Sequence, residues 1–320
     1  MNFRAILATL AGMVPASMAA TLLFLVIYAW PAIDFNGVSF LGGMHWDLGN
    51  LYADPVTVAG VAILPGASYG ILFLIVGTLL STLIALLIAI PVGVGAAIFL
   101  AEAVPPGPRL WLSFLVELLA AIPSVVFGLW GYAVVVPLMA HYVFPALASA
   151  LGRIPAFGEP TGSGFGLLTS GIVLSLMIVP LIAATLRDAI DSQPAEMREA
   201  SAALGATRFE TVWTVILPGL RSVLIGACVL ATGRALGETM AVLMVSGNAL
   251  NTLPQTIYSP ISTMAAFIAS QLDSALQDPT GLAVRSLAEV ALVLCVISII
   301  VNAIARLILA GVDPRHRRDA

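Results

Sequence analysis

The sequence predicts an all-α, polytopic membrane protein with about six transmembrane helices. Of its 320 residues, 60% are hydrophobic and only 9% are charged, whereas a soluble domain carries about 25% charged residues. The mean hydropathy is +1.06, and apolar runs long enough to span a bilayer recur along the chain. We therefore expect one transmembrane domain, residues 1–320, with no sizeable soluble domain.

The order of the apolar runs gives the expected spans. The first run follows Arg4 and continues too far for a cleaved signal peptide, so we interpret it as an anchor. Segments 34–67 and 141–163 are expected to be loops. Within 247–283, residues 261–272 are apolar enough for an interfacial helix or a re-entrant segment. The six expected spans are 8–32, 69–101, 110–138, 165–187, 221–246 and 284–310.

Arginine alone sets the expected orientation, because the chain has no lysine. With the N-terminus in the cytoplasm, only Arg153 and Arg285 lie outside, and Arg234 lies within the membrane. The expected cytoplasmic arginines are Arg4, Arg109, Arg187, Arg198, Arg208, Arg221, Arg306, Arg315, Arg317 and Arg318. This bias predicts that both termini, and a polar island at 188–220, face the cytoplasm.

The polar island is expected to hold two short helices. The first begins at Ser192 or Gln193, with Pro194 in its first turn, where a missing N–H costs little. Gly205 stands where a left-handed residue would end this helix. Thr207 and Glu210 then have the spacing of a capping box, which predicts the start of the second helix.

The same island carries a spaced motif. It runs Glu199-Ala200-Ser201, three residues, Gly205, nine residues, and Val215-Ile216-Leu217-Pro218. This resembles the EAA loop of ABC importer permeases, with Ser201 and Val215 as mild departures from Ala and Ile. An amphipathic helix on the membrane surface would explain the polarity but not this spacing. The resemblance implies a coupling helix that docks on an ATPase through Glu199, Ala200, Gly205, Leu217 and Pro218.

Charged residues inside apolar runs are the other candidates. Arg234 lies near the middle of the fifth expected span, and Glu238 follows four residues later, on the same face of a continuous helix. Because an arginine at this depth is costly, it needs a partner. The residues alone leave two readings open, a structural pair or a contact with a passing anion. Glu117 in the third span is expected to make a structural hydrogen bond.

Three further segments resemble the phosphate-specific ABC permease family of PstC type. They are GRALGETMAVLMVSGN (233–248), ELLAAIPSVVFGLWG (117–131) and the second span at 69–102. The resemblance implies the type I ABC importer permease fold in the cell inner membrane, and it assigns Arg234 and Glu238 to the passage of inorganic phosphate. It also implies three partners: a homologous second permease of PstA type, ATPase subunits of PstB type and a periplasmic phosphate-binding protein of PstS type.

Other functions are less well supported. The chain lacks a GxxxxGK[ST] nucleotide loop, so ATP would bind to a partner, and we expect no enzyme and no cofactor. Three scattered histidines and two cysteines in apolar runs indicate no metal site, and nothing indicates a nucleic-acid partner; membrane lipid is the expected surrounding. Two alternatives stay open: an ABC permease for another oxyanion or small solute, and a secondary transporter driven by an ion gradient.

Overall fold

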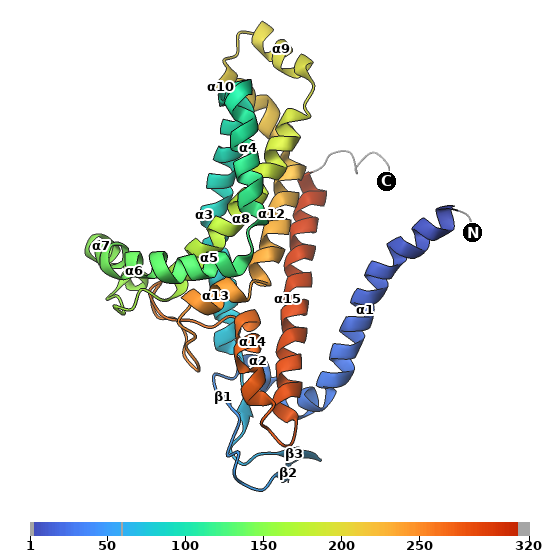
Figure 1. The fold of residues 1–320 in the computed structure, drawn as a ribbon, viewed down its shortest axis with the longest axis vertical. Helices are drawn as coiled ribbons and strands as arrows, with labels where there is room; N and C mark the ends of the chain where they lie inside the picture. Colours follow the sequence, from blue (N-terminus) through green and yellow to red (C-terminus); the bar gives the residue numbers. More distant parts are fainter. Residues whose placement is uncertain (1–2, 59, 313–320) are drawn as a thin grey trace.

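The fold is an α-helical bundle in a computed structural model that describes residues 3–58 and 60–312. Figure 1 shows long helices running side by side along one axis, with α8 inside the group. Arg315, Arg317 and Arg318, which enter the expected orientation, lie outside the described residues. The long helices of the bundle are α3 (Leu72–Ile98), α4 (Pro106–Ala121), α8 (Leu167–Asp191), α12 (Arg221–Leu236) and α15 (Leu282–Val312).

The pair α3 and α8 forms the centre of the bundle. Small residues on α3 let the two backbones approach, as is usual for membrane helices. A Cβ at Gly93 would lie 2.9 Å from Ile182 Cβ, so this position has no room for a larger residue. Fifteen residues of α8 are buried, and α8 is the most buried of the candidate membrane spans. The π-helical segment η1 (Phe99–Ala103) prolongs α3.

Helix α1 (Phe3–Asn36) leans away from this bundle and approaches it only at its C-terminal end (Figure 1). There Asn36 Nδ2 donates to Glu289 Oε2 at 2.8 Å and to Ser286 Oγ at 3.3 Å, both on α15. All three side chains are buried. The helix extends beyond the expected span 8–32 at both ends. The hydrogen bonds of Asn36 attach its C-terminal end to α15.

The first connection contains more structure than the expected loop at 34–67. It carries the short helix α2 (Ser39–Gly42) and two antiparallel strand pairs, in which Trp46 faces Tyr69 and Thr57 faces Ala62. The indole of Trp46 packs edge-on against Tyr69 and Phe267, with 5.0 Å between ring centroids in each case. The strands are β1 (Trp46–Asp47), β2 (Val56–Val58), β3 (Val61–Ile63) and β4 (Ser68–Tyr69).

The expected third span at 110–138 is wrong in one respect, because the chain does not cross as one helix. Helix α4 ends at Ala121, and Ile122 takes an extended ψ of 130°, as a residue before proline prefers. The chain then stays helical to Leu151, into the expected loop 141–163, and runs across the bundle (Figure 1). This transverse arm comprises α5 (Ser124–Trp130), η2 (Gly131–Val135), α6 (Val136–Leu138), η3 (Met139–Val143) and α7 (Phe144–Leu151), and the 3-10 turn η4 (Pro155–Phe157) follows it.

The expected fifth span at 221–246 is also interrupted. Helix α12 ends at Leu236, and α13 (Met240–Val245) begins only after the break Gly237–Thr239. An irregular stretch leads to α14 (Met264–Ala275), which confirms a helix within 261–272. Across the described residues, five helices are long and apolar enough to span a membrane, or six if a pair bent by 70° counts as one span.

Candidate functional site

The polar island folds as two short helices joined by a tight turn. Helix α9 (Ala195–Ala203) begins directly after Pro194, close to the expected start. Gly205 has a φ of +85°, the left-handed conformation expected for it, and its N–H donates to Ala202 O at 2.9 Å. Glycine adopts this conformation without the steric cost that a Cβ brings. The predicted turn is therefore confirmed.

The capping box that starts the second helix is also confirmed. Thr207 Oγ1 accepts from the backbone N–H of Glu210 at 3.3 Å, and Glu210 Oε2 accepts from the backbone N–H of Thr207 at 2.8 Å. These bonds satisfy N–H groups at the start of the helix that lack partners within it. From this cap the chain continues through α10 (Arg208–Thr211), η5 (Val212–Ile216) and α11 (Leu217–Gly219).

Two buried hydroxyls hold the two short helices together. Ser201 Oγ on α9 lies 2.9 Å from Thr211 Oγ1 on α10, and both residues are buried. Thr211 Oγ1 also donates to Thr207 O at 3.0 Å. Ser201 is one of the two departures from the EAA pattern, and here its hydroxyl joins the two arms of the turn.

Arg198 fastens α9 to the bundle. Its Nη2 donates to Glu102 Oε1 at 2.8 Å and its Nε to the same oxygen at 3.2 Å. The guanidinium also donates to Ile190 O at 3.0 Å and to Gln193 O at 3.3 Å, next to the C-terminal end of α8. One side chain thus connects α9 with the ends of two central helices. Nothing in the sequence pattern distinguished Arg198 from the other cytoplasmic arginines.

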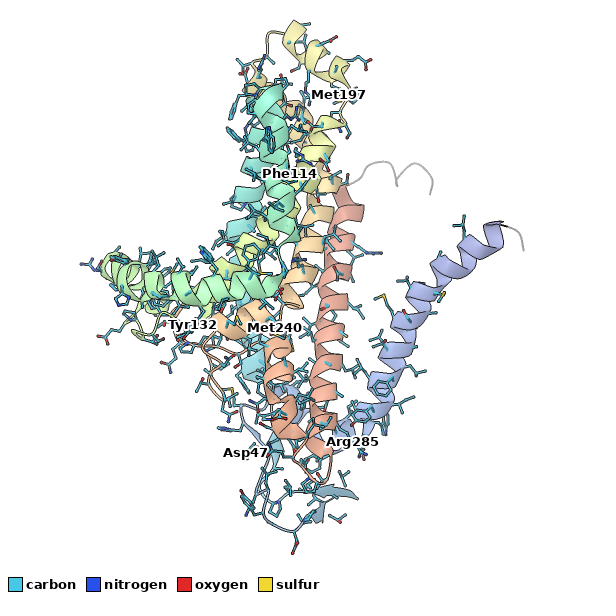
Figure 2. The ribbon with its side chains drawn as sticks, viewed as in Figure 1. Asp47, Phe114, Tyr132, Met197, Met240 and Arg285 are labelled. Atoms are coloured by element: carbon cyan, nitrogen blue, oxygen red, sulfur yellow. The ribbon has the colours of Figure 1, made fainter. Side chains whose placement is uncertain are left out.

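The expected coupling residues occupy two places in this unit. Glu199, Ala200 and Gly205 are exposed on α9 and its turn, which form one extreme of the molecule; Met197 marks α9 there in Figure 2. Leu217 and Pro218 are half-buried in α11, just before the 70° bend into α12. The exposed turn also presents Leu204, which is 90% exposed. The unit therefore offers a polar helix with an apolar tip.

Arg234 and Glu238 do not form the expected pair. Helix α12 ends at Leu236, so the two residues do not share one helical face. Glu238 Oε1 instead accepts from the backbone N–H of Ala241 at 3.3 Å, at the start of α13. Arg234 is exposed on the surface of the chain, and no ion pair joins it to any residue described in the structure. The pairing prediction is wrong because the helix breaks.

Glu117 makes the expected structural contact between helices, as an ion pair with α8. Its Oε1 accepts from Arg187 Nη2 at 2.8 Å. Arg187 is buried, with 7% of its surface exposed, and also donates to Asp188 Oδ1 at 2.6 and 2.9 Å. Arg109 pairs with Asp191 nearby, between α4 and the end of α8. The α9 end of the bundle is thus held by charged contacts.

A second link joins the first connection to the stretch after α13. Asn251 Oδ1 accepts from the backbone N–H of Trp46 at 2.7 Å, and Asn251 Nδ2 donates to Trp46 O at 3.3 Å. Asn251 has a φ of 57°, a conformation that asparagine tolerates better than most residues. Within the described parts of the chain, no group of three or more metal-ligating side chains comes together.

Residues 89–318 match the model of a protein family described as the binding-protein-dependent transport system inner membrane component. The chain belongs to this family. It is 46% identical to the phosphate transport system permease protein PstC 1 of Mycobacterium tuberculosis, over 88% of this chain and 84% of that protein. It is 37% identical to PstC of Pasteurella multocida over 94% and 88%, and 33% identical to a probable PstC of Methanocaldococcus jannaschii over 91% and 89%.

The fold agrees with this family membership. A chain of the MetNI methionine ABC transporter in an inward-facing conformation aligns with 75% of this chain and 96% of its own length, with a TM-score of 0.52 and 17% identity. The predicted all-α ABC importer permease fold is confirmed. The chain is a multi-pass transport subunit, and ATP hydrolysis in such a transporter belongs to a separate ATPase. This sets aside the alternative of a secondary transporter driven by an ion gradient.

Proposed function

We propose that this chain is a transmembrane permease subunit of an ATP-driven phosphate importer and forms half of its translocation pathway. The observation that carries the proposal is the agreement of relatives at 33–46% identity, over most of their length, that are named phosphate permeases. A second, homologous permease of PstA type supplies the other half. ATPase subunits of PstB type bind on the cytoplasmic side, and a periplasmic protein of PstS type delivers inorganic phosphate.

In this proposal Arg234 and Glu238 belong to the pathway. Arg234 is exposed on a helix of the membrane bundle, and a guanidinium there needs a negative partner, which none of the residues that the structure describes provides as an ion pair. Phosphate suits it, because the planar guanidinium can donate two parallel hydrogen bonds to phosphate oxygens. Glu238, in the break beside α13, places a negative charge nearby that favours release of the anion over tight retention.

The island at 188–220 is the proposed coupling unit. Glu199, Ala200 and Gly205 form the surface that docks on the ATPase, and Leu217 and Pro218 form the elbow to the pathway helix α12. Arg198 gives this surface a direct connection to the ends of α3 and α8. A displacement of the docked ATPase would therefore be transmitted to the ends of α3 and α8 through Arg198, and to α12 through Leu217 and Pro218. The proposed orientation has both termini and this unit in the cytoplasm.

The test is uptake of labelled phosphate by the assembled importer in proteoliposomes. Arg234→Gln should abolish uptake while assembly and basal ATPase activity remain, and Arg234→Lys should restore only part, because an ammonium lacks the planar fork. Arg153→Gln, a change of an exposed arginine in the loop after α7, is the matched control and should transport normally. Glu238→Gln should also impair uptake.

Two results would contradict the proposal. If Arg234→Gln lowers the amount of complex and the uptake in equal proportion, the residue is structural. If the wild-type importer carries molybdate or sulfate and not phosphate, the substrate assignment fails while the permease assignment stands.

A further inference from the structure

Two unpaired hydroxyl groups lie in the interior, where α3 meets the start of α14. Thr82 on α3 is 4% exposed, and Thr263, the residue before α14, is 3% exposed. Neither Oγ1 atom has a hydrogen-bond partner among the described residues. Because buried polar side chains almost always have a partner, the two hydroxyls point to a ligand at this place.

The start of α14 lies against α3 at the level of these hydroxyls. Thr78 Oγ1 accepts from the backbone N–H of Met264, the first residue of α14, at 2.9 Å. Phe73, near the start of α3, packs edge-on against Phe267, further along α14, with 6.0 Å between ring centroids. These two contacts show that the helices run antiparallel here. Thr82 follows Thr78 by one turn on the same face of α3, so it lies beyond the N-terminal end of α14.

The N-terminal end of α14 also has free donors. The first N–H groups of a helix find no acceptor within it, and Thr263 makes no capping hydrogen bond with its side chain. None of the hydrogen bonds that join described residues uses the N–H groups of Ala265 and Ala266. Both residues are buried. Two N–H groups and two hydroxyls therefore meet at this end of the helix without partners.

These four groups fit a small, neutral ligand. Residues 261–267 are each at most 8% exposed, so the chain itself encloses the place. A Cβ at Gly77 would lie 2.2 Å from Ser262 O, so α3 and the stretch before α14 are closely packed. None of the four groups is charged, and an ion without a counter-charge is costly in such a site. A water molecule matches them in number, since it can accept from two N–H groups and donate to two oxygens.

We propose that one buried water molecule joins Thr82 of α3 to Thr263 and the N-terminal end of α14, where it accepts from the N–H groups of Ala265 and Ala266. The bridged stretch leads directly to α13, because the N–H of Ile261 donates to Ser246 O at 2.9 Å. The water thus fixes α13 and α14 relative to α3, and Thr82 and Thr263 are positioning residues. The inference concerns the fold of this chain and does not rest on the proposed function.

The first experiment looks for the water itself. A cryo-EM structure of the complete importer in lipid nanodiscs, at a resolution that shows ordered water, should contain a single peak at about 2.7–3.2 Å from both Oγ1 atoms. A map without this peak, in which other buried waters are visible, would overturn the inference. So would a direct hydrogen bond between the two hydroxyls, a peak with five or six oxygen neighbours, which indicates a cation, or a tetrahedral density, which indicates phosphate.

The second experiment tests whether the two hydroxyls act through one water molecule. Thr82→Val and Thr263→Val each remove a hydroxyl at nearly constant shape, so each should expel the water. Hydrogen–deuterium exchange of the complete importer should then show about fivefold faster exchange in peptides that cover 261–267, the effect of one lost hydrogen bond. The double variant should exchange no faster than either single variant, because the same water is lost in all three.

Two further variants are the controls. Thr82→Ser keeps the hydroxyl and should exchange like the wild type. Thr185→Val removes a hydroxyl from α8 that donates to Leu181 O of its own helix, and it should leave the exchange of 261–267 unchanged. Effects that multiply to about 25-fold in the double variant would show that the hydroxyls act independently. That result, or unchanged exchange in both single variants, would refute the shared water.

Discussion

Replacing Arg198 should detach α9 from the bundle while leaving the rest of the fold in place. The suitable change is Arg198→Met, which keeps an apolar stem of similar length and removes every donor of the guanidinium. Glu102 would then lose both of its hydrogen bonds from α9, and the carbonyl groups of Ile190 and Gln193 would lose one each.

The expected cost follows from the exposure of this pair. A hydrogen bond to a charged group contributes about 1.5–3 kcal/mol when it is buried, and an exposed ion pair contributes at most about 1 kcal/mol. The side chains of Arg198 and Glu102 are 31% and 20% exposed, which places the pair between these limits. A net loss of about 2 kcal/mol corresponds to about a 30-fold rise in the population with α9 detached.

Hydrogen–deuterium exchange followed by mass spectrometry measures this population directly. Peptides that cover α9 in Arg198→Met should exchange about 30-fold faster, while peptides from α14 keep their wild-type rates. Arg198→Lys should fall between the two, since an ammonium keeps the charge but cannot serve Glu102 and both carbonyl groups at once. Unchanged exchange in α9, or equal acceleration along the whole chain, would refute the assignment of Arg198 as a local fastener.

Three other changes test separate parts of the structure. Gly205→Val should lower phosphate uptake and transport-linked ATPase activity together, because a β-branched residue strains the left-handed turn between the two short helices by about 1–2 kcal/mol. The strain is in the backbone alone, since no atom lies within 4 Å of the added Cβ. Gly205→Asn should retain more activity, and an equal loss in both variants would argue against the turn. Asn251→Gly keeps a residue suited to positive φ but removes both hydrogen bonds to Trp46, so limited proteolysis should cut the first connection faster, whereas an unchanged cleavage rate would show that the link is not stabilising. A single cysteine at Thr207, in a background without the two native cysteines, should react with an impermeant maleimide only after the membrane is opened; labelling from the periplasm would reverse the proposed topology.

The features of the coupling unit that depend on neighbouring residues were predictable from the sequence. The positive φ of Gly205 and the capping box of Thr207 and Glu210 follow from local backbone sterics and from hydrogen bonds over three residues. The first, second, fourth and sixth expected spans were also predictable, because hydropathy over about 20 residues decides their positions. Each of these predictions needed no knowledge of tertiary contacts.

The breaks in the helices were not predicted, although they had weak signals. Pro123 restricts Ile122 to an extended conformation, and Gly237 follows the last residue of α12, but hydropathy is continuous across both places. Because the i, i+4 argument for Arg234 and Glu238 assumed an unbroken helix, it failed with the helix. The partner of Arg198 lies 96 residues away in the sequence, and no local pattern encodes such a contact.

The two ends of the molecule are held together by different forces. All four ion pairs that join described residues lie toward the α9 end, whereas the opposite end, marked by Asp47 and Arg285 in Figure 2, is packed around the aromatic rings of Trp46 and Phe267. Dissolved salt screens exposed charges that lie farther apart than about 8 Å at physiological ionic strength, or about 3 Å at 1 M, and it screens direct, partly buried pairs much less. The contacts of Arg187 and Arg198 with their carboxylates span only 2.6–2.8 Å and are partly buried, and the rings at the opposite end carry no charge. Neither end therefore depends on a dilute buffer, and we expect the protein to keep both ends in their native state when it is purified in concentrated salt.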